Sequence, residues 1–143
     1  MNTQKASLVA LPFFLENAAL LQKDTKSKLV RILWLLSQDF RHPSLQCKKV
    51  QGAKREVYEC RVDQDFRLIY DIMGNMLRCW YVGKHDVALK YAQATSLSDT
   101  VVQVDDIVIC SMTSDEIQVS QFLDEGIEPD GFVSFPIDHI YSN

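Results

Sequence analysis

His85 is the residue of this sequence whose chemistry is most open to catalysis. It lies in the segment VGKHDVALKY, residues 82–91, where a strand-like run ends in Gly, Lys and then His. An imidazole exchanges its proton near neutral pH, so His85 could act as a general acid or base, and Asp86 beside it could orient the ring. The same histidine could instead be an ordinary polar residue of a turn. The residues alone leave both interpretations open.

Cationic side chains that suit phosphate lie upstream of this histidine. Arg61 and Arg67 belong to two successive strand-like runs, and a guanidinium offers paired donors to a phosphate. Each arginine could equally be a surface charge or half of a structural ion pair. A further basic group surrounds the Gly52 turn and could bind the phosphates of a nucleic acid, although a solvated loop would have the same composition. This group consists of Lys48, Lys49, Lys54 and Arg55.

The charge of the chain is unevenly distributed. The formal net charge is −4, yet all 15 Lys and Arg lie at or before Lys90. Residues 1–90 hold nine acids and carry a net +6, whereas residues 91–143 hold ten acids, no Lys or Arg, and carry −10. A basic body is typical of proteins that meet polyanions. The acidic segment could lie on that body, repel other polyanions, or simply be solvated.

Composition indicates a soluble globular protein, with 143 residues, 47% hydrophobic and 24% charged. That length suits one domain, or a small domain with an appendage. No two cysteines have C-x-x-C spacing and no histidine stands at zinc-finger distance from them, so no metal site is expected. Cys60 and Cys79 are expected to be buried reduced thiols, which favours a cytoplasmic location. No segment has the pattern of a signal peptide or a membrane span.

The elements that must position these side chains begin with helices. Residues 5–11 predict a first strand and residues 12–23 a helix. Apolar residues then recur at helical spacing over residues 25–40, with Asp24 or Thr25 as the expected N-cap. His42-Pro43 is expected to end this second helix, because proline disfavours helix at the preceding residue. The pair predicts a helical hairpin.

Strand signals follow the hairpin. Residues 56–62 alternate as a half-buried strand, residues 66–73 form a second, and residues 76–83 a third after the Gly74-Asn75 turn. Three such strands predict an antiparallel meander covered on one face by the two helices, which is an α+β fold. Beyond residue 92 a small polar linker, a strand within residues 101–110 and a short helix within residues 113–126 are expected.

In this order, the motifs of residues 42–91 resemble the RelE/ParE toxin superfamily of bacterial type II toxin–antitoxin systems. With the helices, the resemblance covers residues 5–92. The expected organisation is therefore a RelE/ParE-like domain at 1–92 and an acidic C-terminal extension at 93–143. The motifs that carry the resemblance are His42-Pro43, the Lys49 to Gly52 element, Tyr58 to Arg61, Phe66 to Tyr70, and Val82 to His85 followed by Tyr91.

The resemblance implies a ribosome-dependent mRNA endonuclease that uses the 2′-OH of the RNA as nucleophile and needs no metal or other cofactor. By position in the motifs, Arg67 would contact the scissile phosphate with Arg61 beside it, and His85 would transfer the proton. Tyr91 could stack on a base. Asp65 matches an acidic position that could orient the histidine, although it could equally be a turn residue. The basic group around Gly52 would then dock on ribosomal or messenger phosphates.

The resemblance also implies other functions for the same fold. Members of the ParE branch inhibit DNA gyrase, and related domains occur joined to helicases as modules whose role is less clear. An antitoxin partner is expected for a toxin of this family, and antitoxins commonly lay an acidic helix and strand across it. The acidic extension could do this in cis, for example by adding a strand to an open sheet edge. A silent interaction module and a gyrase inhibitor therefore stay open beside the endonuclease.

Overall fold

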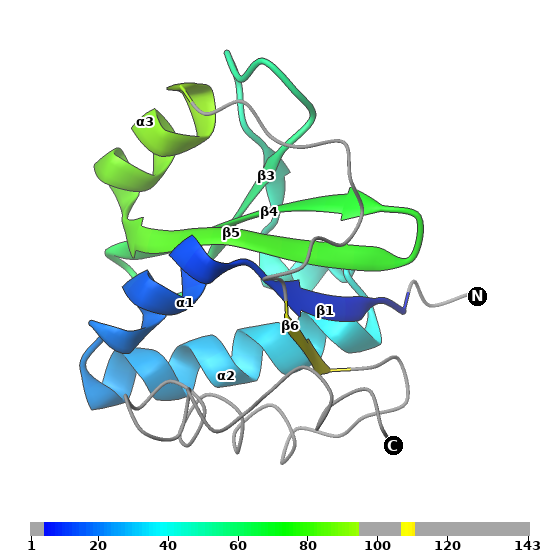
Figure 1. The fold of residues 1–143 in the computed structure, drawn as a ribbon, viewed down its shortest axis with the longest axis horizontal. Coiled ribbons are helices and arrows are strands. Elements are labelled where there is room, and N and C mark those ends of the chain that lie inside the picture. Colours follow the sequence, from blue (N-terminus) through cyan, green and yellow to red (C-terminus); the bar gives the residue numbers. More distant parts are fainter. Residues whose placement is uncertain (1–4, 95–106, 111–143) are drawn as a thin grey trace.

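The computed structural model describes residues 5–94 and 107–110, which form an α+β structure with helices on both faces of one sheet (Figure 1). Its elements confirm the expected strand, helical hairpin and meander, and they add a third helix. In chain order they are β1 (Ser7–Ala10), α1 (Pro12–Ala19), α2 (Lys23–Gln38), the 3-10 turn η1 (Pro43–Leu45), β2 (Lys48–Lys49), β3 (Tyr58–Arg61), β4 (Phe66–Met73), β5 (Met76–Lys84), α3 (His85–Ala94) and β6 (Ile107–Cys110).

The sheet has six strands in the order β2-β3-β4-β5-β1-β6. Strands β3 to β5 form the predicted antiparallel meander, and β4 and β5 are joined at the predicted Gly74-Asn75 turn. The two-residue strand β2, which was not predicted, pairs antiparallel with β3. Strand β1 runs parallel to β5, so that Ser7 pairs with Met76. The sheet is therefore mixed, and the first strand of the chain lies between β5 and the edge strand β6.

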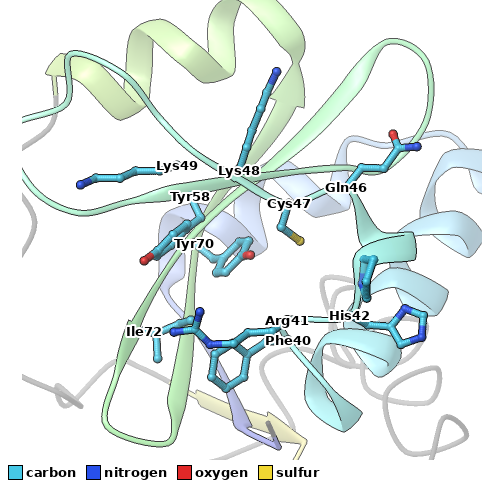
Figure 2. A pocket seen from close by; sticks show the side chains of 11 residues that line it. Phe40, Arg41, His42, Gln46, Cys47, Lys48, Lys49, Tyr58, Tyr70 and Ile72 are labelled. Atoms are coloured by element: carbon cyan, nitrogen blue, oxygen red, sulfur yellow. The ribbon is translucent and has the colours of Figure 1, made fainter. Parts of the chain in front are cut away.

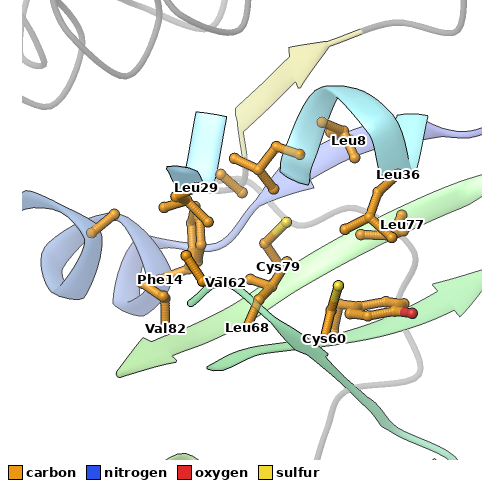
Figure 3. Close-up of a cluster of buried hydrophobic side chains, with 14 of the residues drawn as sticks. Leu8, Phe14, Leu29, Leu36, Cys60, Val62, Leu68, Leu77, Cys79 and Val82 are labelled. Atoms are coloured by element: carbon orange, nitrogen blue, oxygen red, sulfur yellow. The ribbon is translucent and has the colours of Figure 1, made fainter. Parts of the chain in front are cut away.

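The helical hairpin α1–α2 packs on one face of the sheet and forms the larger core with it. Figure 3 shows Phe14 of α1 and Leu29 of α2 in the same buried cluster as Leu68 and Cys79 of the strands, with Leu8 beside Leu36. The expected N-cap at Asp24 or Thr25 is wrong, because α2 already begins at Lys23, without a side-chain cap. The helix also ends at Gln38, before the predicted stop, and the chain turns so that Phe40 enters the core.

Helix α3 covers the opposite face of the sheet and was not expected from the sequence, which placed a turn and then a linker there. Its small residues Ala88 and Ala92 are buried in one cluster with Ile69 and Trp80 of the sheet. His85 is consequently the first residue of a helix and not part of a turn. Among the described residues, no helix is both long enough and apolar enough to cross a membrane.

Strand β6 confirms part of what the sequence suggests for the acidic extension. It lies inside the segment 101–110 expected to be a strand, and it pairs antiparallel with β1 at the edge of the sheet. Val9 of β1 is thereby opposite Val108. The expected short helix at 113–126 and the extended segment after it lie outside the described residues.

A buried ion pair joins β4 and β5, the two central strands of the sheet. Asp71 of β4 is opposite Arg78 of β5 in the register, and the carboxylate accepts two hydrogen bonds from the guanidinium, from Nε at 2.8 Å and Nη2 at 2.5 Å. The Arg78 side chain is 1% exposed, and its guanidinium carbon lies 5.0 Å from the ring centroid of Trp80. The two charges thus satisfy each other inside the fold.

Candidate functional site

Strand register brings three of the predicted site residues to one end of the sheet. Arg61 of β3 is opposite Arg67 of β4, which in turn is opposite Gly83 of β5, and His85 follows two residues later. Arg67 and Ile69 are two residues apart on β4, so their side chains point to the same face of the sheet. Ile69 packs beneath α3 on that face. Arg61 and Arg67, together called the arginine row, therefore lie on the face that carries α3.

His85 occupies the start of α3 and is accessible. Its backbone N–H donates to the carbonyl oxygen of Asp65 at 2.8 Å, which fixes the first turn of the helix to the β3–β4 turn. The imidazole is 42% exposed, and its Nδ1 lies 3.1 Å from the Asp86 carboxylate. The carboxylate is itself 91% exposed, so it can orient the ring but contributes little to stability.

The Arg67 guanidinium is engaged inside the protein. Its side chain is 12% exposed, and Nη1 donates to the carbonyl oxygens of Asp63 at 2.8 Å and Phe66 at 3.0 Å. Its Nε lies 3.5 Å from the buried carboxylate of Glu59. These contacts match the alternative, left open by the sequence, that Arg67 is half of a structural ion pair. The contact of Arg67 with a phosphate stays a prediction.

Asp63 organises the turn that supports the site, a role that sequence reasoning missed. Its Oδ1 accepts hydrogen bonds from the backbone N–H groups of Asp65 at 2.9 Å and Phe66 at 2.8 Å. This is the Asx-type arrangement by which a short acidic side chain holds a turn. Asp65 itself is exposed and meets His85 through its backbone carbonyl, while its predicted orienting role stays untested.

The predicted basic group around Gly52 does not lie next to His85. Lys48 and Lys49 are neighbours on β2 and point in different directions (Figure 2). The Gln51-Gly52 turn is tied to the far end of α3, where Gln93 Nε2 donates to the Gln51 carbonyl at 2.8 Å. Ten helical residues span about 15 Å, so this turn and His85 lie at opposite ends of α3. Of the remaining two cations, Lys54 is exposed and Arg55 is half-buried.

Tyr91 belongs to an aromatic cluster between α1, β5 and α3. Its ring stacks on Tyr81 with centroids 4.8 Å apart, and on Phe13 at 5.5 Å. The side chain of Tyr91 is half-buried, whereas Phe13 is exposed on α1. A base that stacked on this cluster would meet Phe13 as well, which the sequence did not single out.

Solved structures of other proteins have a fold similar to that of this chain. The chain matches the crystal structure of the toxin YafQ from E. coli strain BL21(DE3) at a TM-score of 0.50 and 20% identity, over 59% of this chain and 98% of that one. The chain has a RelE-like fold. YafQ in the E. coli DinJ–YafQ toxin–antitoxin complex matches equally well, at a TM-score of 0.50 and 22% identity over 58% of this chain and 96% of that one.

A third match is a YafQ variant from E. coli in which a histidine is replaced by glutamine, at a TM-score of 0.50 and 22% identity over 59% of this chain and 98% of that one. No protein-family model and no curated protein sequence matches the chain. At these identities the likeness establishes the RelE-like fold, and the chemistry has to be argued from the chain's own residues.

One glycine of this RelE-like sheet is required by the aromatic cluster. A Cβ added to Gly83 would lie 2.7 Å from ring carbons of Tyr81, whose ring is held by Tyr91 and Phe13. We expect Gly83→Ala to lower the free energy of unfolding by about 1–3 kcal/mol, as overpacking does elsewhere. Urea denaturation followed by circular dichroism measures this change.

The matched control removes the obstructing ring. Tyr81→Ala is destabilising on its own, but the double variant with Gly83→Ala should lose less than the two single losses together, since no ring remains to meet the new methyl group. Strictly additive losses would show that the Tyr81 ring is not what requires glycine here.

Proposed function

We propose that this chain is a toxin of the toxin–antitoxin type that cleaves mRNA on the ribosome, without a metal ion, by attack of the 2′-OH on the adjacent phosphate. The observation that carries the proposal is an accessible imidazole, His85, at the head of α3 in a RelE-like fold, beside the arginine row on the same end of the sheet. An acid–base group next to guanidinium groups is what this reaction requires.

Each predicted residue has a separate role in the proposed reaction. His85 takes a proton from the attacking hydroxyl or gives one to the departing 5′-oxygen, with Asp86 orienting the ring. Arg61, which is exposed, meets the charge that develops on the phosphate. Arg67 can join it if its guanidinium exchanges turn carbonyls for phosphate oxygens.

Docking is assigned to residues away from the reacting atoms. Lys48 and Lys49 on β2, with Lys54 and Arg55 in the following loop, would bind ribosomal or messenger phosphates. Tyr91, with Phe13, would offer an aromatic surface to an unpaired base. We also propose a separate antitoxin protein as partner, since the fold is shared with YafQ, which has been crystallised in a toxin–antitoxin complex with DinJ.

Induced expression of the full chain in a bacterial host tests the proposal. We expect growth arrest together with new mRNA 5′ ends inside coding regions, mapped by primer extension, and both effects should be relieved by co-expression of the cognate antitoxin. Growth arrest with intact mRNA and altered plasmid supercoiling would instead point to DNA gyrase as the target.

Strand β6 supports a second candidate, a RelE-like domain held silent by its own acidic extension. This strand already pairs with β1 at the sheet edge, as an added inhibitory strand would. A chain ending at Ala94 is the appropriate comparison, since it keeps the whole of α3 with its buried Ala92. A harmless full chain with a toxic shorter chain would establish inhibition in cis. If both folded chains are harmless, an interaction module is the better description.

A further inference from the structure

A hollow of about 260 Å³ opens on the sheet edge away from His85, between the segment that follows α2, η1 and strands β2 to β4 (Figure 2). The proposed RNA cleavage does not use it. Its walls include the stacked rings of Tyr58 and Tyr70, and the Cys47 sulfur points into it. Cys47 is partly accessible, in contrast to the buried thiols expected of Cys60 and Cys79, which the structure confirms.

Extending the β2–β3 register by one residue places Cys47 opposite Cys60. Lys48 pairs with Glu59 and Lys49 with Tyr58, so the next step of the same antiparallel register joins the two cysteines. The Val50 N–H donates to the Val57 carbonyl, which makes that pair hydrogen-bonded. Counting back by alternation, Cys47 and Cys60 form a non-hydrogen-bonded pair. Such pairs bring Cα atoms to about 4.5 Å, within the range of about 4.4–6.8 Å that a disulfide spans.

The two thiols also share their polar surroundings. Both sulfurs lie near the Leu45 carbonyl oxygen, Cys60 at 3.4 Å and Cys47 at 3.9 Å. Hydrogen bonds from the thiol of Cys60 and the hydroxyl of Tyr70 lower the pKa of Cys47 against the opposing effect of its burial. The same Cys47–Cys60 contact and burial raise the pKa of Cys60. One thiol is thus set to ionise first while the other keeps its proton.

We propose that Cys47 and Cys60 are a redox pair, in which a small hydroperoxide entering the hollow oxidises Cys47 and Cys60 then closes a disulfide with it. Neither cysteine belongs to the machinery of the proposed RNA cleavage, so the pair can be tested without a ribosome.

The reaction balances in two steps. The Cys47 thiolate attacks one peroxide oxygen, the O–O bond breaks, and the departing oxygen leaves as water with hydrogen peroxide as oxidant, which gives a sulfenic acid on Cys47. The Cys60 sulfur then attacks the Cys47 sulfur, the S–O bond breaks, and the hydroxide leaves as water with the Cys60 proton. Two thiols and one peroxide thus yield one disulfide and two waters.

The bond would join the two ends of the segment that carries the basic group. Residues 47–60 contain β2, its loop and the start of β3, with all four cations assigned to phosphate docking. A cross-link at the base of this hairpin restricts the unfolded chain and holds β2 on the sheet edge. Oxidation is therefore expected to raise the urea concentration at which the protein unfolds.

Peptide mass spectrometry of the full chain after hydrogen peroxide treatment tests the pair. The reduced protein is exposed to peroxide, free thiols are alkylated, and the digest is compared with and without dithiothreitol. We expect a reducible cross-link between the peptides of Cys47 and Cys60. In the untreated protein, Cys47 should react with iodoacetamide on the order of tenfold faster than buried Cys79, because an accessible thiolate is the nucleophile.

Single serine variants provide matched controls. Cys47→Ser should abolish the cross-link and the stabilisation by peroxide, whereas Cys79→Ser and Cys110→Ser should retain both, with folding of each variant verified by circular dichroism. The inference is overturned if the folded wild-type protein links Cys47 to Cys110 or to a second copy. It is equally overturned if Cys47 proceeds to the sulfinic acid while Cys60 stays alkylatable.

Discussion

Replacing Asp71 by Asn is expected to lower the free energy of unfolding by about 3–5 kcal/mol, the cost of leaving one charge of a buried pair uncompensated. The substitution keeps the size of the side chain and removes the negative charge that faces the Arg78 guanidinium. Because Arg78 is 1% exposed, water cannot take the place of the lost carboxylate without opening the sheet. Urea denaturation of the purified chain gives the difference.

Two controls separate charge from packing in this prediction. The double variant Asp71→Leu, Arg78→Met replaces both charges by apolar side chains and should lose much less stability than Asp71→Asn, since an apolar replacement of a buried pair is often nearly neutral. Asp86→Asn removes a carboxylate that is 91% exposed and should change stability by less than about 0.5 kcal/mol. A loss below about 1 kcal/mol for Asp71→Asn would contradict the expectation that buried Arg78 needs this carboxylate.

Replacing His85 by Ala is expected to reduce mRNA cleavage by about 10²–10⁴-fold, the usual contribution of a positioned acid or base. The helix itself should persist, since the Asp65 carbonyl binds the backbone N–H of residue 85 and not the side chain. Cleavage of a defined mRNA on programmed ribosomes measures the effect.

The two arginines provide an informative comparison in the same assay. Arg61→Ala alters an exposed side chain, so a loss of cleavage with unchanged stability would assign Arg61 to the phosphate. Arg67→Ala removes hydrogen bonds to the Asp63 and Phe66 carbonyls, so it is expected to lower the free energy of unfolding as well. A loss of cleavage by this variant therefore has to be compared with its measured loss of stability. A His85→Ala protein that cleaves as fast as the wild type would exclude this histidine from the chemistry.

Local signals were sufficient for most of the fold. The strand predicted at residues 66–73 is β4 to the residue, because a short run of apolar and aromatic residues ends directly at the Gly74-Asn75 turn, and both signals are local. Helix α3 escaped prediction because Ala88 and Ala92, which pack on the sheet, contribute little hydrophobic signal. A ten-residue helix of this kind depends on the surface beneath it. Strand β2 consists of two exposed lysines and is defined by pairing alone.

The candidate site was predictable in its residue types but not in its contacts. Sequence motifs single out Arg67, yet whether its guanidinium faces solvent or the carbonyls of a turn depends on how the chain folds between Asp63 and Phe66. The basic residues are close in sequence, but α3 separates their turn from His85. Similarly, the opposition of Cys47 and Cys60 depends on the β2–β3 register, which no single segment encodes.

The parallel pairing of β1 with β5 also sets the order in which a newly made chain can fold. Strand β1 is synthesised early, but its partner residues in β5 emerge from the ribosome long afterwards, since Ser7 pairs with Met76. The helical hairpin can form meanwhile, yet its core stays open until that partner arrives. His85 follows directly after β5. If the chain acts on ribosomes as proposed, the ribosome that makes it has therefore translated nearly the whole domain before any catalytic surface exists.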